Sequence, residues 1–241
     1  MKYTSLKKME QGFIIDRLTN SILNTVSGDS FQTEVIRLGK TDLKHITKIK
    51  GWNFNWKQEY DEIKKEVYKL TIANNPNIIQ GLLSESIEQD HVFMDLLESA
   101  PFNIGKHKIY EGVAGNLVAY ACKISFQKGF EGYVSFTAKT KLIDHYEKTL
   151  GAYHFKNQRM IIETEAAKIL VEKYFYNLEI MGLVKEPQGV DFIIQSPLLT
   201  DIERKEISEF IRTRKLQNKR QVNRTNSKKT LKPNALKMPN A

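Results

Sequence analysis

A run of small residues, Gly112-Val113-Ala114-Gly115-Asn116, is the segment of the sequence most suggestive of chemistry. It stands where a strand-like segment ends and an apolar helix, expected over residues 112–128, begins. The start of a helix offers unpaired backbone N–H groups and the positive end of the helix dipole, and small side chains let a ligand approach them. The segment therefore predicts a pyrophosphate site. Small residues also pack helices closely against sheets, and this is the competing interpretation.

The elements around this helix predict a parallel crossover. Strand-like segments lie before it at residues 92–97 and after it at 133–137, and a second helix over 140–149 leads to a strand that begins at 160–162. Strand, helix, strand, helix and strand in this order are typical of parallel strands joined across one face of a sheet.

An antiparallel meander is expected before the crossover. Strand patterns cover residues 67–72, 78–87 and 92–97, and clusters of turn-forming residues separate them. Three further elements come first, namely a strand over 31–38 and helices over 41–49 and 57–65. The sequence therefore predicts an α/β domain whose mixed sheet is flanked by helices.

These segments resemble the GNAT superfamily of acyl-CoA N-acyltransferases. The signature of that family is Arg or Gln, two residues, Gly, one residue, and Gly or Ala, followed by an apolar helix. This chain has Gly112 and Ala114 at the small positions and Ile109 at the first. The end of the helix, Gln127-Lys128-Gly129-Phe130, resembles the Lys-Gly-Tyr with which the family ends it. The resemblance covers roughly residues 31–162.

A second motif supports the same resemblance. Residues 142–152 look like the Phe-Tyr-Glu-Lys-Leu-Gly-Phe segment of the family with one residue, Thr149, inserted. Tyr146 falls on the tyrosine of that segment. Lys139 stands seven residues earlier, where the family often has Asn.

The resemblance implies a centrally splayed sheet with acetyl-CoA, or another acyl-CoA, as co-substrate between the two splayed strands. The pyrophosphate would meet the N–H groups of residues 113–116. The pantetheine arm would pair with the backbone near residues 97–101, which include Leu97 and Ser99.

The resemblance also implies a general acid and a general base. Tyr146 would donate a proton to the leaving thiolate, and an acidic side chain on the preceding strands would help to deprotonate the amine. Glu98 is the preferred base and Glu85, on the neighbouring strand, is the second candidate. The competing interpretations are an aromatic ring packed on the sheet for Tyr146 and a solvated charge at a strand end for Glu98.

The implied function is acyl transfer from acyl-CoA to an amine, which makes the chain an N-acetyltransferase. The acceptor stays open among antibiotics, polyamines, peptide N-termini, lysines and tRNA. The alternative is a catalytically weak binding module on the same scaffold, acting through protein or nucleic-acid contacts.

The basic charge of the chain is concentrated at its end. Ten of the 37 Lys and Arg residues lie within 211–241, where there is no Asp or Glu, so the rest of the chain is nearly neutral despite the net charge of +9. Residues 217–241 are poor in apolar residues and are expected to form a disordered tail. Such a tail could bind nucleic-acid phosphates, bind a partner or have no specific role; it has no aromatic residues for base stacking.

Four regions are therefore expected: a helical N-terminal extension over 1–30, the GNAT-like domain over 31–162, an extension over 163–216 with helices and one strand at 190–195, and the tail over 217–241.

Other classes find little support. The single cysteine, Cys122, allows no internal disulfide, which fits a reducing compartment, and it is expected to be a core residue of a helix. Neither a membrane span nor a secretory signal is evident. A cytoplasmic location is therefore expected. The histidines show no metal-binding spacing. Trp52, Phe54 and Trp56 could line an acceptor pocket or pack as a half-buried loop.

Overall fold

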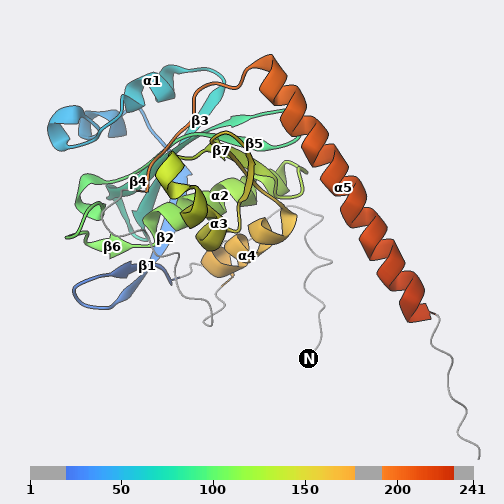
Figure 1. The fold of residues 1–241 in the computed structure, drawn as a ribbon. Coiled ribbons are helices and arrows are strands. Elements are labelled where there is room, and N and C mark those ends of the chain that lie inside the picture. The colour runs from blue at the N-terminus through green and yellow to red at the C-terminus, as the bar shows by residue number, and fades with distance from the viewer. Residues whose placement is uncertain (1–19, 177–191, 231–241) are drawn as a thin grey trace, which may run out of the picture. The chain divides into compact units, whose positions relative to one another are not determined.

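The computed structural model describes residues 20–176 and 192–230 of the chain (Figure 1). These residues form two compact units, one ending at Pro197 and the other beginning at Leu198. None of the helices in these ranges is long and apolar enough to cross a membrane.

The described part of the first unit is built on one mixed sheet. Its strands are β1 (Asn20–Asn24), β2 (Ser30–Arg37), β3 (Lys65–Ile72), β4 (Asn75–Ile87), β5 (Val92–Ser99), β6 (Tyr110–Glu111), β7 (Val134–Thr137), β8 (Tyr153–Lys156), β9 (Arg159–Ile162) and β10 (Ile194–Gln195). They lie in the order β6-β1-β2-β3-β4-β5-β7-β9-β8, and β10 pairs with β5 beside this path. The pairing of β2 through β5 is antiparallel and that of β5 with β7 is parallel. The predicted meander is therefore confirmed, as is the parallel crossover from β5 to β7. The connection through the second predicted helix is not parallel, because β9 pairs with β7 in the antiparallel direction.

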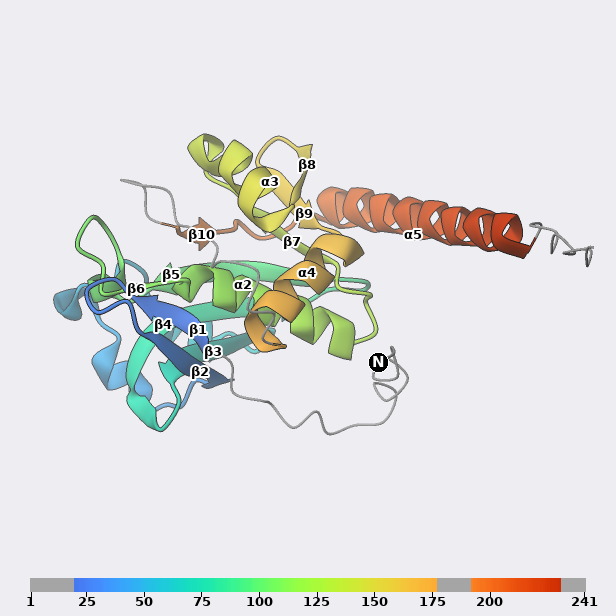
Figure 2. The ribbon, with the colours of Figure 1, turned by 90° about the horizontal axis from the view of Figure 1, so that it is seen from below.

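Helices cover both faces of the sheet. On one face, α2 (Val113–Gln127) packs against β4, β5 and helix α4 (Thr164–Phe175), and α3 (Ile143–Leu150) lies between β7 and β8 in sequence (Figure 2). These helices and the sheet enclose the larger apolar core. On the other face, α1 (Trp56–Asp61) and the loop before it cover a smaller core that contains Trp52 and Trp56.

The N-terminal extension differs from the prediction over its described part. Residues 20–24 form strand β1, which pairs with β2 and β6, rather than a helix. The helical spacing of Ile22 and Val26 is misleading, because Ile22 is fully buried whereas Val26 is 90% exposed in the turn that follows β1. Residues 1–19 of this predicted extension lie outside the described range.

Two predicted helices are shorter than expected. The segment 41–49 forms two 3-10 turns, Asp42–His45 and Lys48–Lys50, and the polar helix is limited to α1. The Asp42 side chain makes contacts outside its 3-10 turn. Its carboxylate accepts a hydrogen bond from the Gly39 N–H and pairs with the Lys69 ammonium at 2.8 Å. Strand β8 was absent from the sequence prediction.

The described part of the second unit contains one long helix, α5 (Asp201–Thr230). Its start has the predicted cap, because the Thr200 hydroxyl accepts a hydrogen bond from the Glu203 N–H and the Glu203 carboxylate accepts one from the Thr200 N–H. The sequence predicts a disordered tail from residue 217, whereas α5 continues to Thr230. No Gly or Pro interrupts residues 201–230, and Lys, Arg and Gln favour the helix.

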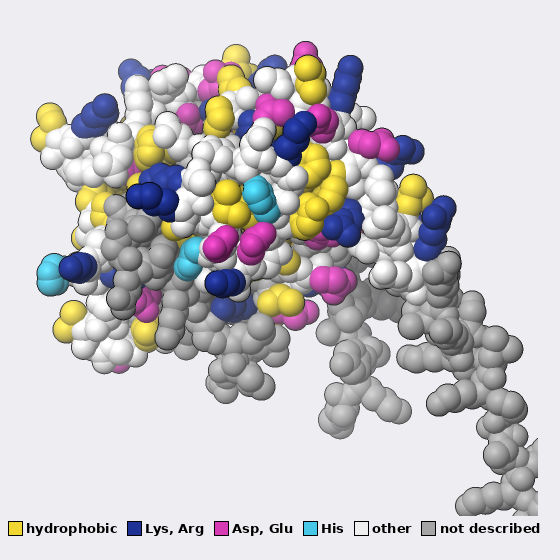
Figure 3. All heavy atoms as spheres, in the orientation of Figure 1, with side chains coloured by type: hydrophobic (Ala, Val, Ile, Leu, Met, Phe, Trp, Pro, Cys, Tyr) yellow, Lys and Arg dark blue, Asp and Glu magenta, His cyan; other side chains and the backbone are white. Residues whose placement is uncertain are grey.

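Charged side chains show no separation by sign over the face drawn in Figure 3, where basic and acidic groups are interspersed. This agrees with the nearly neutral charge of the chain before residue 211.

Candidate functional site

Strands β5 and β7 part soon after they meet. Two residue pairs join them, Val92 with Val134 and Phe93 with Ser135, whereas β5 continues to Ser99. Beyond Phe93 the backbone of β5 on this side therefore has no partner in β7. We call the point where the two strands part the β5–β7 fork; it is the central splay that the sequence predicts.

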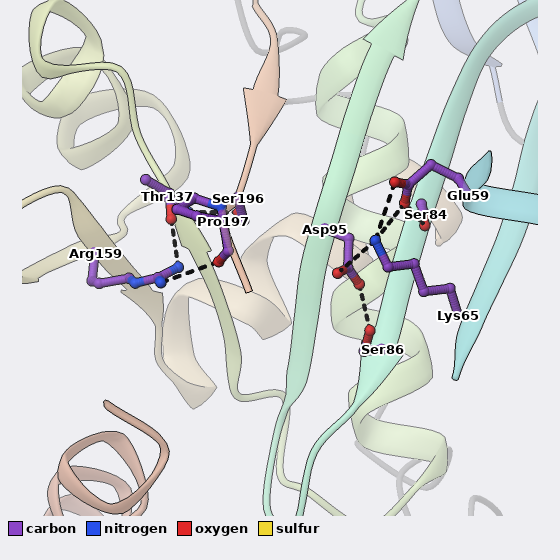
Figure 4. Close-up of polar contacts among 9 residues, drawn as sticks. All are labelled: Glu59, Lys65, Ser84, Ser86, Asp95, Thr137, Arg159, Ser196 and Pro197. Carbon is purple, nitrogen blue, oxygen red and sulfur yellow. Dashed lines mark hydrogen bonds and ion pairs between the residues drawn. The ribbon is translucent and has the colours of Figure 1, made fainter. Parts of the chain in front are cut away.

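Strand β10 occupies the β5–β7 fork. Ile194 pairs with Leu97 and Gln195 with Leu96, and the next residue, Ser196, donates its N–H to the Asp95 carbonyl at 2.8 Å. The Ser196 hydroxyl accepts a hydrogen bond of 2.9 Å from the Thr137 N–H on β7. The segment thus bridges both strands of the fork (Figure 4). The sequence predicts a strand at 190–195 but gives no indication of this position; residues 190 and 191 lie outside the described range.

The start of α2 has the geometry expected of an anion site. Gly112 precedes the helix with a φ of +87°, a left-handed conformation that favours glycine. The N–H groups of Val113, Ala114 and Gly115 have no partner within the helix, because the Asn116 N–H makes the first intrahelical bond, to the Gly112 carbonyl.

Close packing also explains the small residues here. The side chains from Val113 to Asn116 are buried, and a Cβ added to Gly81 on β4 would lie only 2.8 Å from Cγ1 of Val113. The start of α2 therefore presses directly onto the sheet. The pyrophosphate site at this helix stays a prediction.

Tyr146 lies on α3 with its ring fully buried. The ring makes edge contacts with Phe136 of β7, with centroids 5.3 Å apart, and with Phe192, just before β10, at 4.9 Å. Its hydroxyl has no hydrogen-bond partner among the described residues. Burial raises the pKa of Tyr146, so the phenol keeps its proton at neutral pH. The ring packing and an acid role are compatible with this position.

Glu98 holds the aromatic loop in place. Its Oε1 accepts hydrogen bonds from the backbone N–H and the side-chain amide of Asn53, at 2.7 and 2.9 Å, and its Oε2 accepts one from the Trp56 indole N–H at 2.7 Å. It is buried, so it is not a solvated charge at a strand end. Three charge-assisted bonds give this carboxylate a clear structural task.

Glu85, unlike Glu98, accepts no hydrogen bonds from the described residues. It is fully buried, and both of its carboxylate oxygens are without hydrogen-bond partners among the described residues. Burial, assisted by the negative charge of Glu66, raises the pKa of Glu85 well above its usual range and so favours its protonated form.

The predicted bases lie on opposite faces of the sheet. Glu85 is opposite Met94, which belongs to the larger core, whereas Glu98 is opposite Leu82, which belongs to the smaller core. Tyr146 is also part of the larger core. The structure therefore brings Tyr146 and the start of α2 to one face and places Glu98 on the other.

A partly buried ionic cluster beside the fork has no counterpart in the sequence predictions. The Lys65 ammonium lies 2.8 Å from the Glu59 carboxylate and 3.2 Å from that of Asp95, and the hydroxyls of Ser84 and Ser86 donate to the same two carboxylates (Figure 4). Burial raises the pKa of Asp95, although Ser86 and Lys65 oppose this shift. The available signal was charged residues inside segments that otherwise look like buried strands.

The remaining candidates are structural in the described ranges. Trp52 and Trp56 are core residues in edge contact, which favours the packing interpretation of the aromatic loop. Cys122 is buried within α2, as predicted. No group of metal-binding side chains is present among residues 20–176 and 192–230.

No protein-family model matches the sequence, and no curated protein is similar to it. Among solved structures, AtaTR bound with AcCoA matches at 15% identity and a TM-score of 0.43, over 57% of this chain and 97% of that chain. The spermidine/spermine N-acetyltransferase SpeG from Vibrio cholerae in complex with manganese ions matches at 15% and 0.40, over 56% and 94%.

The ribosomal-protein-S18-alanine N-acetyltransferase from Escherichia coli matches at 11% identity and a TM-score of 0.36, over 54% of this chain and 94% of that chain. At these identities and TM-scores, the function has to be inferred from the residues of this chain.

Replacing Glu98 by Gln tests its structural task. Whichever oxygen becomes an NH₂ group, a donor then faces the donor of Asn53 or Trp56, so we expect the free energy of unfolding to fall by about 1–3 kcal/mol. Urea denaturation followed by tryptophan fluorescence measures this. Glu62→Gln, at an exposed carboxylate, is the matched control. Equal stability of the Glu98 variant and the wild type would contradict this assignment.

The raised pKa of Glu85 predicts a pH-dependent stability difference. Above about pH 4.3 the unfolded chain loses this proton while the folded chain keeps it, so the wild type loses stability as the pH rises until the pKa of the folded state is passed. Glu85→Gln removes this loss. The stability of the variant relative to the wild type should therefore increase as the pH rises from about 4.3 towards the raised pKa of the folded state.

Urea denaturation at each pH checks this prediction, because the contributions of all other groups cancel in the difference. A difference that stays flat across this range would show that Glu85 titrates normally in the folded protein.

Proposed function

We propose that this protein transfers an acyl group from acyl-CoA to an amine. The observation that carries the proposal is the β5–β7 fork: two parallel strands part beside the start of a helix that opens on small residues, and the ring of a buried tyrosine lies against one arm of the fork. The crossover β5-α2-β7 supplies the fork and the helix start, and the tyrosine follows on α3.

The site would hold acyl-CoA through backbone groups. The N–H groups of Val113 to Gly115 would bind the pyrophosphate, and Asn116 would remain tied to β2 through its hydrogen bond to the Thr33 hydroxyl at 2.8 Å. The pantetheine arm carries amide groups that can pair with an open strand edge. The edge of β5 at Leu96 and Leu97 is suited to such pairing, since β10 uses it in this way.

In the reaction, the acceptor nitrogen attacks the thioester carbonyl, the C–N bond forms, the C–S bond breaks and the sulfur leaves as a thiolate. Tyr146 retains its proton because it is buried, so it can donate that proton to the thiolate. The amine loses a proton to a base. Glu98 is the better candidate, because burial raises the pKa of Glu85 and favours its protonated form, and because three donors occupy only part of the roughly four acceptor positions of Glu98.

Binding of acyl-CoA is the first test. Acetyl-CoA at about 100 times its dissociation constant should stabilise the protein by about 2.7 kcal/mol and raise its melting temperature. Gly115→Glu should abolish the shift, because it places bulk and negative charge at the start of α2. Gln127→Glu adds the same charge at the exposed far end of the helix and is the control. No shift for the wild type at saturating acetyl-CoA would contradict the proposal.

The acid role of Tyr146 is the second test. Tyr146→Phe keeps the ring and removes the proton donor, so turnover should fall by about 10²–10⁴ while the affinity for acetyl-CoA is unchanged. Thiol release from acetyl-CoA with a panel of polyamines, peptides and aminoglycosides measures turnover. Equal turnover by the variant would reject the role. Tight acetyl-CoA binding without turnover on any amine would favour the alternative, a binding module.

A further inference from the structure

We infer that residues 192–197, the β10 segment, form an autoinhibitory strand that occupies the place of the pantetheine arm. This inference rests on the proposed function, because it concerns access to the same site. The β10 segment must leave the β5–β7 fork before acyl-CoA can bind there.

The first observation is competition for one backbone edge. The sequence resemblance assigns the pantetheine arm to β5 near residues 97–101, and β10 pairs with β5 at Leu96 and Leu97. Each backbone N–H donates one hydrogen bond in a ladder, so the same residues cannot pair with two extended groups on the same side. The carbonyl of Asp95, one residue earlier, is likewise taken by the Ser196 N–H.

The second observation is that the β10 segment fills the space with side chains. Phe192 and Ile194 are buried in the larger core, and Ile193 between them is also buried. Phe192 lies against the Tyr146 ring at 4.9 Å and against His145 at 6.1 Å. With Phe192 in place, the Tyr146 hydroxyl is shut off from solvent, and no substrate atom can reach it.

The third observation is a polar clamp on the end of the segment. The Arg159 guanidinium, on β9, donates to the Pro197 carbonyl at 3.2 Å and to the Thr137 hydroxyl on β7. It also lies over the Phe93 ring of β5, 5.4 Å from its centroid. Residues from β5, β7 and β9 thus converge on one short segment (Figure 4).

The β10 segment can leave without dismantling the rest of the sheet. It pairs through two residues at the side of the strand path, and the order from β6 to β8 is continuous without it. Its removal returns the fork to two parted strands. The apparent affinity for acyl-CoA is then the intrinsic affinity multiplied by the fraction of molecules in which the fork is vacant.

Two variants separate the closed and vacant forms. Ile194→Asp places a charge at a fully buried position and should drive the segment out. Leu198→Asp makes the same chemical change four residues later at a side chain that is 71% exposed, and is the matched control. A double variant, Leu96→Cys with Gln195→Cys, locks the segment, because opposed Cα atoms in an antiparallel pair lie about 4.5–5.5 Å apart, within reach of a disulfide.

The measurement is acetyl-CoA affinity by isothermal titration calorimetry on the full chain, with circular dichroism to verify folding. Ile194→Asp should bind at least about tenfold more tightly than the wild type and Leu198→Asp. The oxidised double variant should show no binding, and reduction should restore the wild-type affinity. The single variant Gln195→Cys, under the same oxidant, controls for effects on Cys122.

Each other outcome is decisive. Equal affinities for the wild type, Ile194→Asp and the oxidised double variant would overturn autoinhibition and leave acyl-CoA binding intact. If no form binds acetyl-CoA, including folded Ile194→Asp, both the proposed function and the inference are wrong. If Ile194→Asp unfolds, the reversible lock decides alone, since oxidation must abolish binding and reduction must restore it.

Discussion

Buried backbone groups need hydrogen-bond partners, and the parting of β5 from β7 leaves such groups exposed in the middle of a sheet. Most of the architecture around the site can be understood from this requirement. The parallel crossover brings the strands together for two residue pairs only, and α2 fits tightly where Gly81 leaves room for it. Something must then pair with the vacant edge of β5, and in this structure the chain itself does so.

The two faces of the sheet differ in how their buried polar groups are accommodated. The helical face holds an apolar core that contains Tyr146 and borders Glu85, whose pKa is raised by burial. The opposite face holds charges that are satisfied by partners, Glu98 by the aromatic loop and Lys65 by two carboxylates. Buried ion pairs of this kind fix geometry more than they add stability. This difference explains why the Glu98 carboxylate accepts three hydrogen bonds while that of Glu85 has no hydrogen-bond partner among the described residues.

Local patterns predicted the elements, and long-range contacts decided the rest. The spacing of apolar residues and the positions of turn-forming residues predict the meander, α2 and β7, because each of these elements has its own local sequence pattern. The partners of Glu98 could not be read in this way, since Asn53 and Trp56 lie more than 40 residues upstream. The spacing of Ile22 predicts a helix, because spacing alone does not reveal that this residue lies in a strand that pairs with β2 and β6. The sequence predicts a strand at 190–195, but it does not predict that β10 pairs with β5, because this pairing depends on which strand edge in the folded sheet lacks a partner.

The short link between β10 and α5 limits how far these two elements can move apart. Residues 196–200 are the whole connection between Gln195 and Asp201. Five extended residues span less than about 20 Å. A macromolecule that binds the long basic helix is therefore also connected to β10 through this link. A pull along the link reaches the hydrogen bond between the Arg159 guanidinium and the Pro197 carbonyl before it reaches the bond between the Ser196 N–H and the Asp95 carbonyl.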